Sequence, residues 1–312
     1  MPRLSRMNLP APIALLLAVF CSGIASGAEP MEVSVMTFNI RYGTASDGEH
    51  AWPHRKETVA RFIGESALDF VGIQESLASQ TTFLRKEVGG TYDMIVRTRE
   101  RVDGRGEATP LLYRKDRWEL DPERHGTFWL SLTPEEPGSK SWESSLPRIA
   151  TWGRFTERTT GRPIWVLNTH FDHRSAPARH EAGRLIARRL GELVPAGEPV
   201  VVLGDLNARP DTPPLQALQA GAGERPILLI DAWKSTNPDG RHPCTFNGWG
   251  EGMEGRRIDH VLVSPGVEIL ACDIERERID GRPISDHWPV RANLRVPETS
   301  KGSVDRPVPE PG

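Results

Sequence analysis

Short apolar runs in this 312-residue chain end repeatedly at side chains that could bind a ligand or move a proton. These polar groups are Asn39, Gln74-Glu75, Asn168-Thr169-His170, Gly204-Asp205-Leu206-Asn207, Asp259-His260 and Ser285-Asp286-His287. In a sandwich of sheets, strand ends from distant parts of a sequence gather at one rim, where ligand pockets tend to form. The pattern therefore predicts one site assembled from several strand ends.

The candidate ligands favour a hard cation. Asn39, Glu75, Asp205, Asn207 and Asp286 all offer oxygen, and no cysteine belongs to the set. Oxygen ligands suit Mg²⁺, Mn²⁺ or Ca²⁺ rather than structural zinc. Histidines beside such a cation can transfer protons or stabilise charge that develops on a phosphoryl group. Together these groups are typical of a phosphoester-hydrolysis site.

Each motif also has a simpler structural explanation. A single carboxylate after a strand more often caps a turn or a helix than binds a ligand, and the same holds for Asn39 or Asn207 alone. His170 alone could be a hydrogen-bonded histidine of the core. The argument for function depends on the conjunction, because capping does not explain five strand ends that carry metal-compatible or proton-transfer groups.

The elements that must position these residues are mostly strands. Alternating or continuous apolar patterns predict strands at 32–38, 69–73, 92–97, 110–114, 126–130, 149–156, 163–169, 199–203, 257–264, 267–273 and 288–294. Helical spacing predicts helices at 55–66, 79–88 and 176–193. Many strands with few helices indicate sheets packed face to face with helices outside. Roughly 265 residues can bury such a core as one domain.

The two ends of the chain differ from this body. Arg3 and Arg6 precede an apolar run at 13–20 and small residues up to 28, which is typical of a secretory signal peptide cleaved before Glu29. The alternative is a permanent anchor, but the run is shorter than the ~20 residues that span a bilayer. We therefore expect a signal peptide at 1–28, no stable membrane span, and export to a periplasmic or extracellular location.

The mature body is expected at residues 29–296, and the Pro-, Ser- and charge-rich residues 297–312 are expected to form a disordered tail. Hydrophobic residues at 38% and charged residues at 26% exclude disordered and fibrous classes for the whole chain. Cys244 and Cys272 could pair in an oxidising compartment or remain two buried thiols, and the sequence leaves both open.

The net charge bears on the partner. The chain has 39 basic and 42 acidic residues, and loss of two arginines with the signal peptide leaves 37 against 42, a net charge of −5. A general nucleic-acid binder normally carries a basic excess. The densest arginine cluster, at 97–101 with Arg105, is interrupted by acidic residues.

The ordered motifs at 39, 74–75, 168–170, 204–207, 258–260 and 285–287 resemble those of the endonuclease/exonuclease/phosphatase superfamily. The resemblance runs from about residue 32 to 295, and the stretches 37–41, 52–55, 147–152 and 168–173 are similar to an uncharacterised secreted bacterial branch. It implies an α/β fold of the DNase-like type, a four-layer α/β sandwich with two packed mixed sheets flanked by helices. It also implies a divalent-metal phosphoester hydrolase that uses Mg²⁺ or Mn²⁺, with Ca²⁺ also compatible.

The resemblance implies a role for each residue in turn. Glu75 resembles the principal metal carboxylate, supported by Asn39 and, through water, by Asp286. Asp205 resembles the residue that orients or deprotonates the attacking water, and Asn207 the donor to the phosphate.

Further roles follow from the same resemblance. His287 matches the histidine that contacts the scissile phosphate, with Asp259 holding its tautomer, and His170 matches a second histidine near the leaving group. Arg114 matches a phosphate-facing arginine. Asp172, His173 and Arg179 could line the pocket or pack against the loop before the helix at 176–193.

The expected substrate is a phosphoester, preferably a small or lipid-linked one, because a phosphate backbone is bound mainly through Lys and Arg. A secreted nuclease that cleaves DNA or RNA is the alternative. No protein partner is implied.

Overall fold

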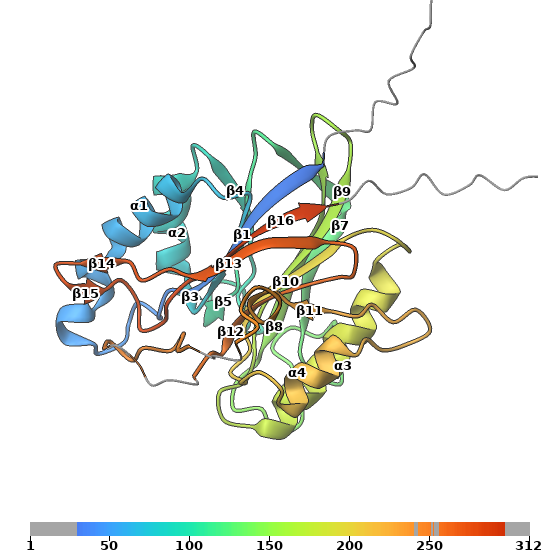
Figure 1. The fold of residues 1–312 in the computed structure, drawn as a ribbon. Helices are drawn as coiled ribbons and strands as arrows, with labels where there is room; N and C mark the ends of the chain where they lie inside the picture. The colour runs from blue at the N-terminus through green and yellow to red at the C-terminus, as the bar shows by residue number, and fades with distance from the viewer. Residues whose placement is uncertain (1–29, 240–242, 251, 253–255, 297–312) are drawn as a thin grey trace, which may run out of the picture.

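The computed structural model describes residues 30–239, 243–250, 252 and 256–296, and within them two six-stranded sheets pack against each other (Figure 1). In spatial order the first sheet contains β13 (Glu268–Ile274), β16 (Val290–Val296), β1 (Met31–Asn39), β2 (Phe70–Gln74), β6 (Leu111–Arg114) and β4 (Tyr92–Ile95). The second contains β11 (Ile230–Asp231), β12 (Asp259–Val263), β10 (Val200–Asp205), β9 (Pro163–His170), β8 (Ile149–Glu157) and β7 (Trp118–Trp129). Both sheets are mixed, because β1–β2 and β9–β10 are parallel pairs and the other pairs are antiparallel.

Helices cover the outer faces of both sheets. Figure 1 shows α1 (Lys56–Ser66) and α2 (Ala78–Val88) on one side, and α3 (Ala176–Leu193) and α4 (Pro213–Gln219) on the other. The apolar sides of α1 and α2 pack on β1 and β2, and those of α3 and α4 pack on β9 and β10. The four-layer α/β sandwich is therefore confirmed.

Smaller elements complete the chain. They are the 3₁₀ turns η1 (Gly48–His50) and η2 (Trp52–His54), the helix α5 (Ala232–Thr236), and the short ladders β3 (Ser76–Leu77) with β5 (Glu107–Ala108) and β14 (Arg278–Ile279) with β15 (Arg282–Pro283). The sequence did not predict α5 or these ladders, because elements of two to five residues are too short for periodicity to show.

Strand β7 is longer than predicted. It begins at Trp118, whereas the pattern predicted a strand only from 126. The register with β8 shifts between Leu120 and His125, and this irregularity breaks the alternation of apolar and polar residues there.

Two expectations, the signal peptide at 1–28 and the disordered tail at 297–312, lie outside the described residues. In the described part of the chain, none of the helices has both the length and the apolar character needed to cross a membrane. Cys244 and Cys272 are present as two buried thiols rather than as a disulfide. Burial raises the pKa of the Cys272 thiol to about 12.

Alternation along β1 decides where its last side chain points. Val33 and Val35 belong to the core between the two sheets, whereas Met36 and Phe38 belong to the core beneath the helices. Because successive side chains of a strand face opposite sides, Asn39 shares the inter-sheet side with Val33 and Val35.

The second sheet follows the same rule. Val201 and Leu203 lie in the inter-sheet core, so Asp205 at the end of β10 also faces the first sheet. On β9, Val166 lies in this core, which places Asn168 and His170 on the same face. Because side chains alternate between the two faces of each strand, the last polar side chain of each strand lies at the rim between the sheets.

Asn168 connects the two sheets directly beneath that rim. Its Nδ2 donates to the carbonyl oxygens of Ile73 (2.8 Å) and Pro110 (2.9 Å), and its Oδ1 accepts from Nε2 of Gln74 (2.6 Å). The sheets come so close here that a Cβ on Gly72 would lie 2.6 Å from Asn168 Oδ1 and 3.0 Å from Leu203 Cβ. Position 72 therefore has no room for a side chain larger than that of glycine.

We predict that Gly72→Ala lowers the free energy of unfolding by about 1–3 kcal/mol, the usual cost of overpacking a core. Urea titration followed by tryptophan fluorescence measures the change. Gly90→Ala is the matched control, because a Cβ there meets nothing within 4 Å, and we expect it to change stability by no more than about 0.5 kcal/mol. Equal stability of the two variants would contradict the close approach of the sheets.

Candidate active site

A cavity of about 590 Å³ opens at the rim where these strands end. Six of the sequence-predicted site residues line it, namely Glu75, His170, Asp205, Asn207, Asp286 and His287. Asn39 and Asp259 contact this group from behind, through Asp205 and His287 respectively. The structure therefore brings together eight of the nine predicted residues, from both sheets.

Asp205 lies at the centre of the cluster. Its Oδ2 accepts a hydrogen bond from Asn39 Nδ2 (3.0 Å) and lies 3.4 Å from His170 Nε2 and 3.8 Å from His287 Nε2. Its Oδ1 accepts from the backbone N–H of Asn207 (2.9 Å), which turns back in a left-handed conformation with φ 45°. Burial, together with the negative charge of Asp259, raises the pKa of Asp205 to about 7.

His287 and Asp259 form a buried pair. The imidazole Nδ1 lies 2.9 Å from Asp259 Oδ2, so this nitrogen carries a proton that it donates to the carboxylate. Burial alone would lower the pKa of His287, but the charges of Asp259 and Asp205 outweigh it and raise the pKa well above its usual value. The structure thus presents an imidazolium whose Nε2–H faces Asp205.

His170 has the opposite character. Burial, followed by the positive charges of Arg148 and Arg99, lowers its pKa well below the ordinary value, so the ring is neutral. Asn207 Nδ2 lies 3.1 Å from His170 Nε2 and also donates to the carbonyl of Phe171 (3.1 Å). The site therefore holds one charged and one neutral imidazole, an arrangement that separates proton-donating from proton-accepting roles.

Glu75 and Asp286 are the two further carboxylates that line the cavity. Glu75 accepts hydrogen bonds from Asn39 Nδ2 (3.1 Å) and from the backbone N–H of Tyr42 (3.0 Å). Asp286 Oδ2 lies 3.5 Å from a guanidinium nitrogen of Arg41. Burial raises the pKa of Asp286, and the negative charge of Glu75 acts in the same direction against the opposing effect of His287.

The orientation of Asn39 differs from the predicted ligand role. Its Oδ1 accepts the backbone N–H of Arg41 (2.9 Å), and its Nδ2 faces Glu75 and Asp205. An oxygen contact to a cation would need the amide turned over, because only the amide oxygen can bind a metal. In this structure Asn39 is a donor that bridges two carboxylates.

The donor set fits a divalent cation. Glu75, Asp205 and Asp286 bring three carboxylates to one cavity, and the pKa values of Asp205 and Asp286 are raised because protein groups do not fully offset the buried charge. Carboxylate oxygens of this kind suit Mg²⁺ or Mn²⁺. A hard cation would relieve the mutual repulsion of these groups.

The trio Asp205, Asp259 and His287 also satisfies the spacing of a metal site, with ligand atoms within 4.8 Å of one another. Because Nδ1 of His287 donates to Asp259, only its Nε2 could bind a cation, and only after losing its proton. Glu75 and Asp286, which lie outside this trio and line the same cavity, are the alternative candidate ligands.

Arg114 is not part of this site, and its predicted phosphate-facing role is wrong. Strand β6 runs antiparallel to β2 and pairs Tyr113 with Phe70, so Arg114 lies at the end of β2 that is remote from Glu75. Its guanidinium binds Asp116 at 2.6 Å, near the surface.

The arginines that line the pocket are instead Arg41, Arg148 and Arg256. The sequence analysis gave none of them a role, although Arg41 and Arg148 lie in the stretches 37–41 and 147–152 that carry the resemblance. A signal existed for Arg148, since it directly precedes β8, the antiparallel neighbour of β9. The start of β8 must therefore lie beside the end of β9. Of the residues after His170, His173 lines the pocket. The carboxylate of Asp172 instead accepts hydrogen bonds from Ser145 and from the backbone N–H of Ser175 in the loop before α3, and Arg179 donates to the carbonyl oxygen of Asp172.

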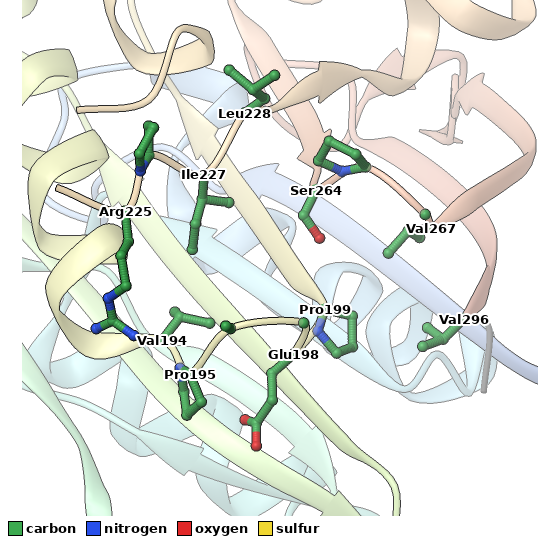
Figure 2. A pocket seen from close by; sticks show the side chains of 15 residues that line it. Val194, Pro195, Glu198, Pro199, Arg225, Ile227, Leu228, Ser264, Val267 and Val296 are labelled. Carbon is green, nitrogen blue, oxygen red and sulfur yellow. The ribbon is translucent and has the colours of Figure 1, made fainter. Parts of the chain in front are cut away.

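A second cavity, of about 420 Å³, lies at the opposite end of the second sheet (Figure 2). Pro199 and Ser264 line it, at the start of β10 and the end of β12, far along both strands from Asp205 and Asp259. Its carboxylate, Glu198, is already bound by Arg154 and by Trp165. This cavity therefore offers no comparable chemical groups.

Comparisons with known proteins agree with the geometry. Residues 36–287 match the model of the Endonuclease/Exonuclease/phosphatase family. A solved endonuclease/exonuclease/phosphatase from Bacteroides vulgatus is 34% identical, with a TM-score of 0.77, and the match covers 85% of this chain and 99% of that one. A search among curated proteins found no match.

Two further structures share the fold. A mannosyl-6-phosphatase from Bacteroides thetaiotaomicron is 28% identical, with a TM-score of 0.72, and the match covers 84% of this chain and 99% of that one. TDP2 from D. rerio, solved with a single-strand DNA product, is 16% identical, with a TM-score of 0.65 and coverage of 84% and 98%. The latter similarity speaks for the fold alone.

We predict that Mn²⁺ raises the melting temperature and that Glu75→Gln abolishes this rise, because the variant removes a carboxylate from the candidate cation site that Glu75 forms with Asp286. At a cation concentration of about 100 times Kd, binding adds about 2.7 kcal/mol of stability. Thermal unfolding with Mn²⁺ and with EDTA measures the effect, and the exposed Glu49→Gln is the matched control. A rise that survives in Glu75→Gln but disappears in Asp259→Asn would place the cation at the other trio.

Proposed function

The chain belongs to the endonuclease/exonuclease/phosphatase family, whose members hydrolyse phosphoester bonds, and from this premise we propose that it is a divalent-metal-dependent phosphatase or phosphodiesterase of a small phosphoester. The observation that carries the proposal is that Glu75, Asp205 and Asp286 share one cavity with two histidines. One of these histidines is protonated and the other is neutral.

Asp205 is the proposed base for the attacking water. Asn39 and the backbone N–H of Asn207 hold its carboxylate in place, so it can orient a water molecule and accept its proton. A pKa near the working pH suits this role. Burial between the sheets is what brings the pKa of this carboxylate into that range.

The histidines would serve the phosphoryl group and the leaving group. His287, kept protonated by Asp259, would donate its Nε2–H to a phosphoryl oxygen, and Asn207 is a second donor nearby. The neutral His170 would lie towards the leaving oxygen. A cation held by Glu75 and Asp286 would polarise a phosphoryl oxygen. Mg²⁺ or Mn²⁺ is the preferred cation, and Ca²⁺ is also compatible.

A small substrate is favoured over nucleic acid. The cavity volume lies within the usual range of small-molecule sites, about 300–1,000 Å³. A net charge of −5 without residues 1–28 gives little general attraction for a phosphate backbone. The similarity to a mannosyl-6-phosphatase supports the same choice. A lipid-linked phosphoester remains within the proposal.

Export is proposed on the pattern of residues 1–28 alone. Expression of the full chain in a bacterium, followed by mass measurement of the protein from the periplasmic and medium fractions, tests it. A mass that begins at Glu29 in either fraction supports export, and an uncleaved chain confined to the cytoplasm contradicts it.

The substrate class is tested with a panel of phosphoesters, each with Mg²⁺, Mn²⁺ or Ca²⁺ and with EDTA. The panel contains p-nitrophenyl phosphate, bis-p-nitrophenyl phosphate, sugar phosphates, inositol phosphates, sphingomyelin, plasmid DNA and RNA. Cleavage of plasmid or RNA that falls steeply with added salt would favour the nuclease. Turnover of small esters should change little with salt, and a lack of metal-dependent turnover on every substrate would overturn the enzymatic proposal.

We predict that Asp205→Asn lowers kcat by about 10²–10⁴-fold, because it removes the base while keeping the shape of the side chain. Without metal, the melting temperature of the variant should be unchanged or higher than that of the wild type. The raised pKa of Asp205 means that its ionised form destabilises the folded state, and the neutral amide removes this effect. Steady-state kinetics and calorimetry measure both effects. Asp116→Ala, at the surface and remote from the cavity, is the control and should retain full activity. Full activity of Asp205→Asn would remove this residue from the mechanism.

A further inference from the structure

We propose that Arg148, Glu107 and His173 form a subsite that binds the hydroxyl groups of the leaving group, so that the substrate is a phosphorylated sugar or polyol. The inference rests on the proposed function and adds a substrate class to it. It depends on the place of these residues along the second sheet, on their hydrogen bonds and on their combined charge.

The subsite lies beside the reacting centre rather than on it. Asp205 pairs with His170 on β9, and Ala150 of β8 pairs with Thr169 of β9, so the start of β8 lies next to the end of β9. Arg148 therefore lies two strands from Asp205, roughly 10 Å away at about 4.8 Å per strand. At that distance Arg148 faces the part of the substrate beyond His170, where the leaving group is expected.

Arg148 is buried and only partly hydrogen-bonded. Its residue is 4% exposed, and within the described residues its Nε and Nη1 have no hydrogen-bond partner. The carboxylate oxygen of Asp172 lies 3.8 Å from Nε, too far for a hydrogen bond. Buried donors of this kind are rarely left without an acceptor. Both nitrogens are also shielded from the cavity, so other atoms of Arg148 form the cavity wall, and a ligand oxygen would reach Nε or Nη1 only after the side chain shifts.

His173 presents a fixed tautomer to the same space. Its Nδ1 lies 2.9 Å from Arg148 Nη2, and because a guanidinium can only donate, this nitrogen must be the acceptor. Burial and the charge of Arg148 lower the pKa of His173, so the ring is neutral and its hydrogen is on Nε2. His173 thus adds a donor to the pocket wall.

Glu107 supplies the acceptor. Its Oε2 binds Arg99 Nη1 at 2.7 Å, and its side chain lines the cavity together with Arg148 and His173. The two arginines are offset by two carboxylates, Glu107 and Asp172, so the wall carries little net charge. A second phosphate would gain little from such a wall, whereas hydroxyl groups can both accept from Arg148 and donate to Glu107.

The test compares two monoesters that differ in their leaving groups. Mannose 6-phosphate carries hydroxyl groups and p-nitrophenyl phosphate does not, and the ratio of their kcat/KM values is the readout. We expect Arg148→Met to lower this ratio about 10- to 100-fold, because hydrogen bonds from a charged donor to the sugar are lost. Glu107→Gln is a second variant of conserved volume and should lower the ratio in the same direction.

Arg154→Met is the matched control. Arg154 lies on β8, the strand that Arg148 directly precedes, and its guanidinium binds Glu198 away from the catalytic cavity. We expect this variant to keep the wild-type ratio. If Arg148→Met does not fold, Glu107→Gln and the more exposed His173→Asn decide the outcome by the same ratio.

Three results would overturn the subsite. One is an unchanged ratio in Arg148→Met, and another is an equal loss on both monoesters, which would place Arg148 on the phosphoryl group itself. A third is a strong preference of the wild type for glucose 1,6-bisphosphate over glucose 6-phosphate, which would indicate an anion subsite. Hydrolysis of p-nitrophenyl phosphate by the wild type tests the proposed function separately, so failure of the subsite leaves that result intact.

Discussion

The contact between Gly72 and Asn168 sets the distance between the two sheets at the rim that carries the site. Asn168 donates to two backbone carbonyls of the first sheet and accepts from Gln74, so it fixes both sheets at this level. Glu75 follows Gln74 directly, and His170 follows Asn168 by two residues. The distance between the Glu75 carboxylate and the His170 imidazole therefore depends on the Asn168 amide and on the absence of a side chain at Gly72.

This geometry buries charge that has to be offset. Asp205 and Asp259 both lie almost completely buried at the ends of adjacent antiparallel strands, where they form a register pair. The protonated His287 lies between them, and Asn39 donates to Asp205 and to Glu75. The raised pKa of Asp205 shows that these partners leave part of the cost uncompensated. The negative charge that these partners leave uncompensated suits the cluster to binding a cation and to exchanging a proton.

The pocket divides into two parts along the second sheet. Asp259, Asp205, His170 and Arg148 follow one another at the start of β12, the ends of β10 and β9, and the start of β8. The first three belong to the reacting end, together with Glu75 and Asp286 from the opposite sheet. Arg148 belongs to an end with a balanced set of donors and acceptors. The same fold also occurs in a phosphatase and in a protein that binds a DNA product, so substrate choice has to come from such local groups rather than from the architecture.

The sequence alone determined the sandwich and most of the residues that the structure brings together at the cavity. Asn39, Asp205 and His170 each end an apolar strand, so both the strand and the polar group at its end are encoded locally. The strands that end at His170 and Asp205 are continuous apolar runs, so the packing of the two sheets decides which face their last side chains share. The order of the motifs along the chain carried the family resemblance, and the family match over residues 36–287 confirms it.

Only the tertiary structure decided the remainder. Arg114 and Arg148 both adjoin strand ends, and what separates them is the direction of β6 and of β8 relative to their neighbours. The amide orientation of Asn39 and the different charge states of His170 and His287 depend on partners that are distant in sequence. Strand direction and buried electrostatics arise from long-range packing, and local periodicity carries no information about either.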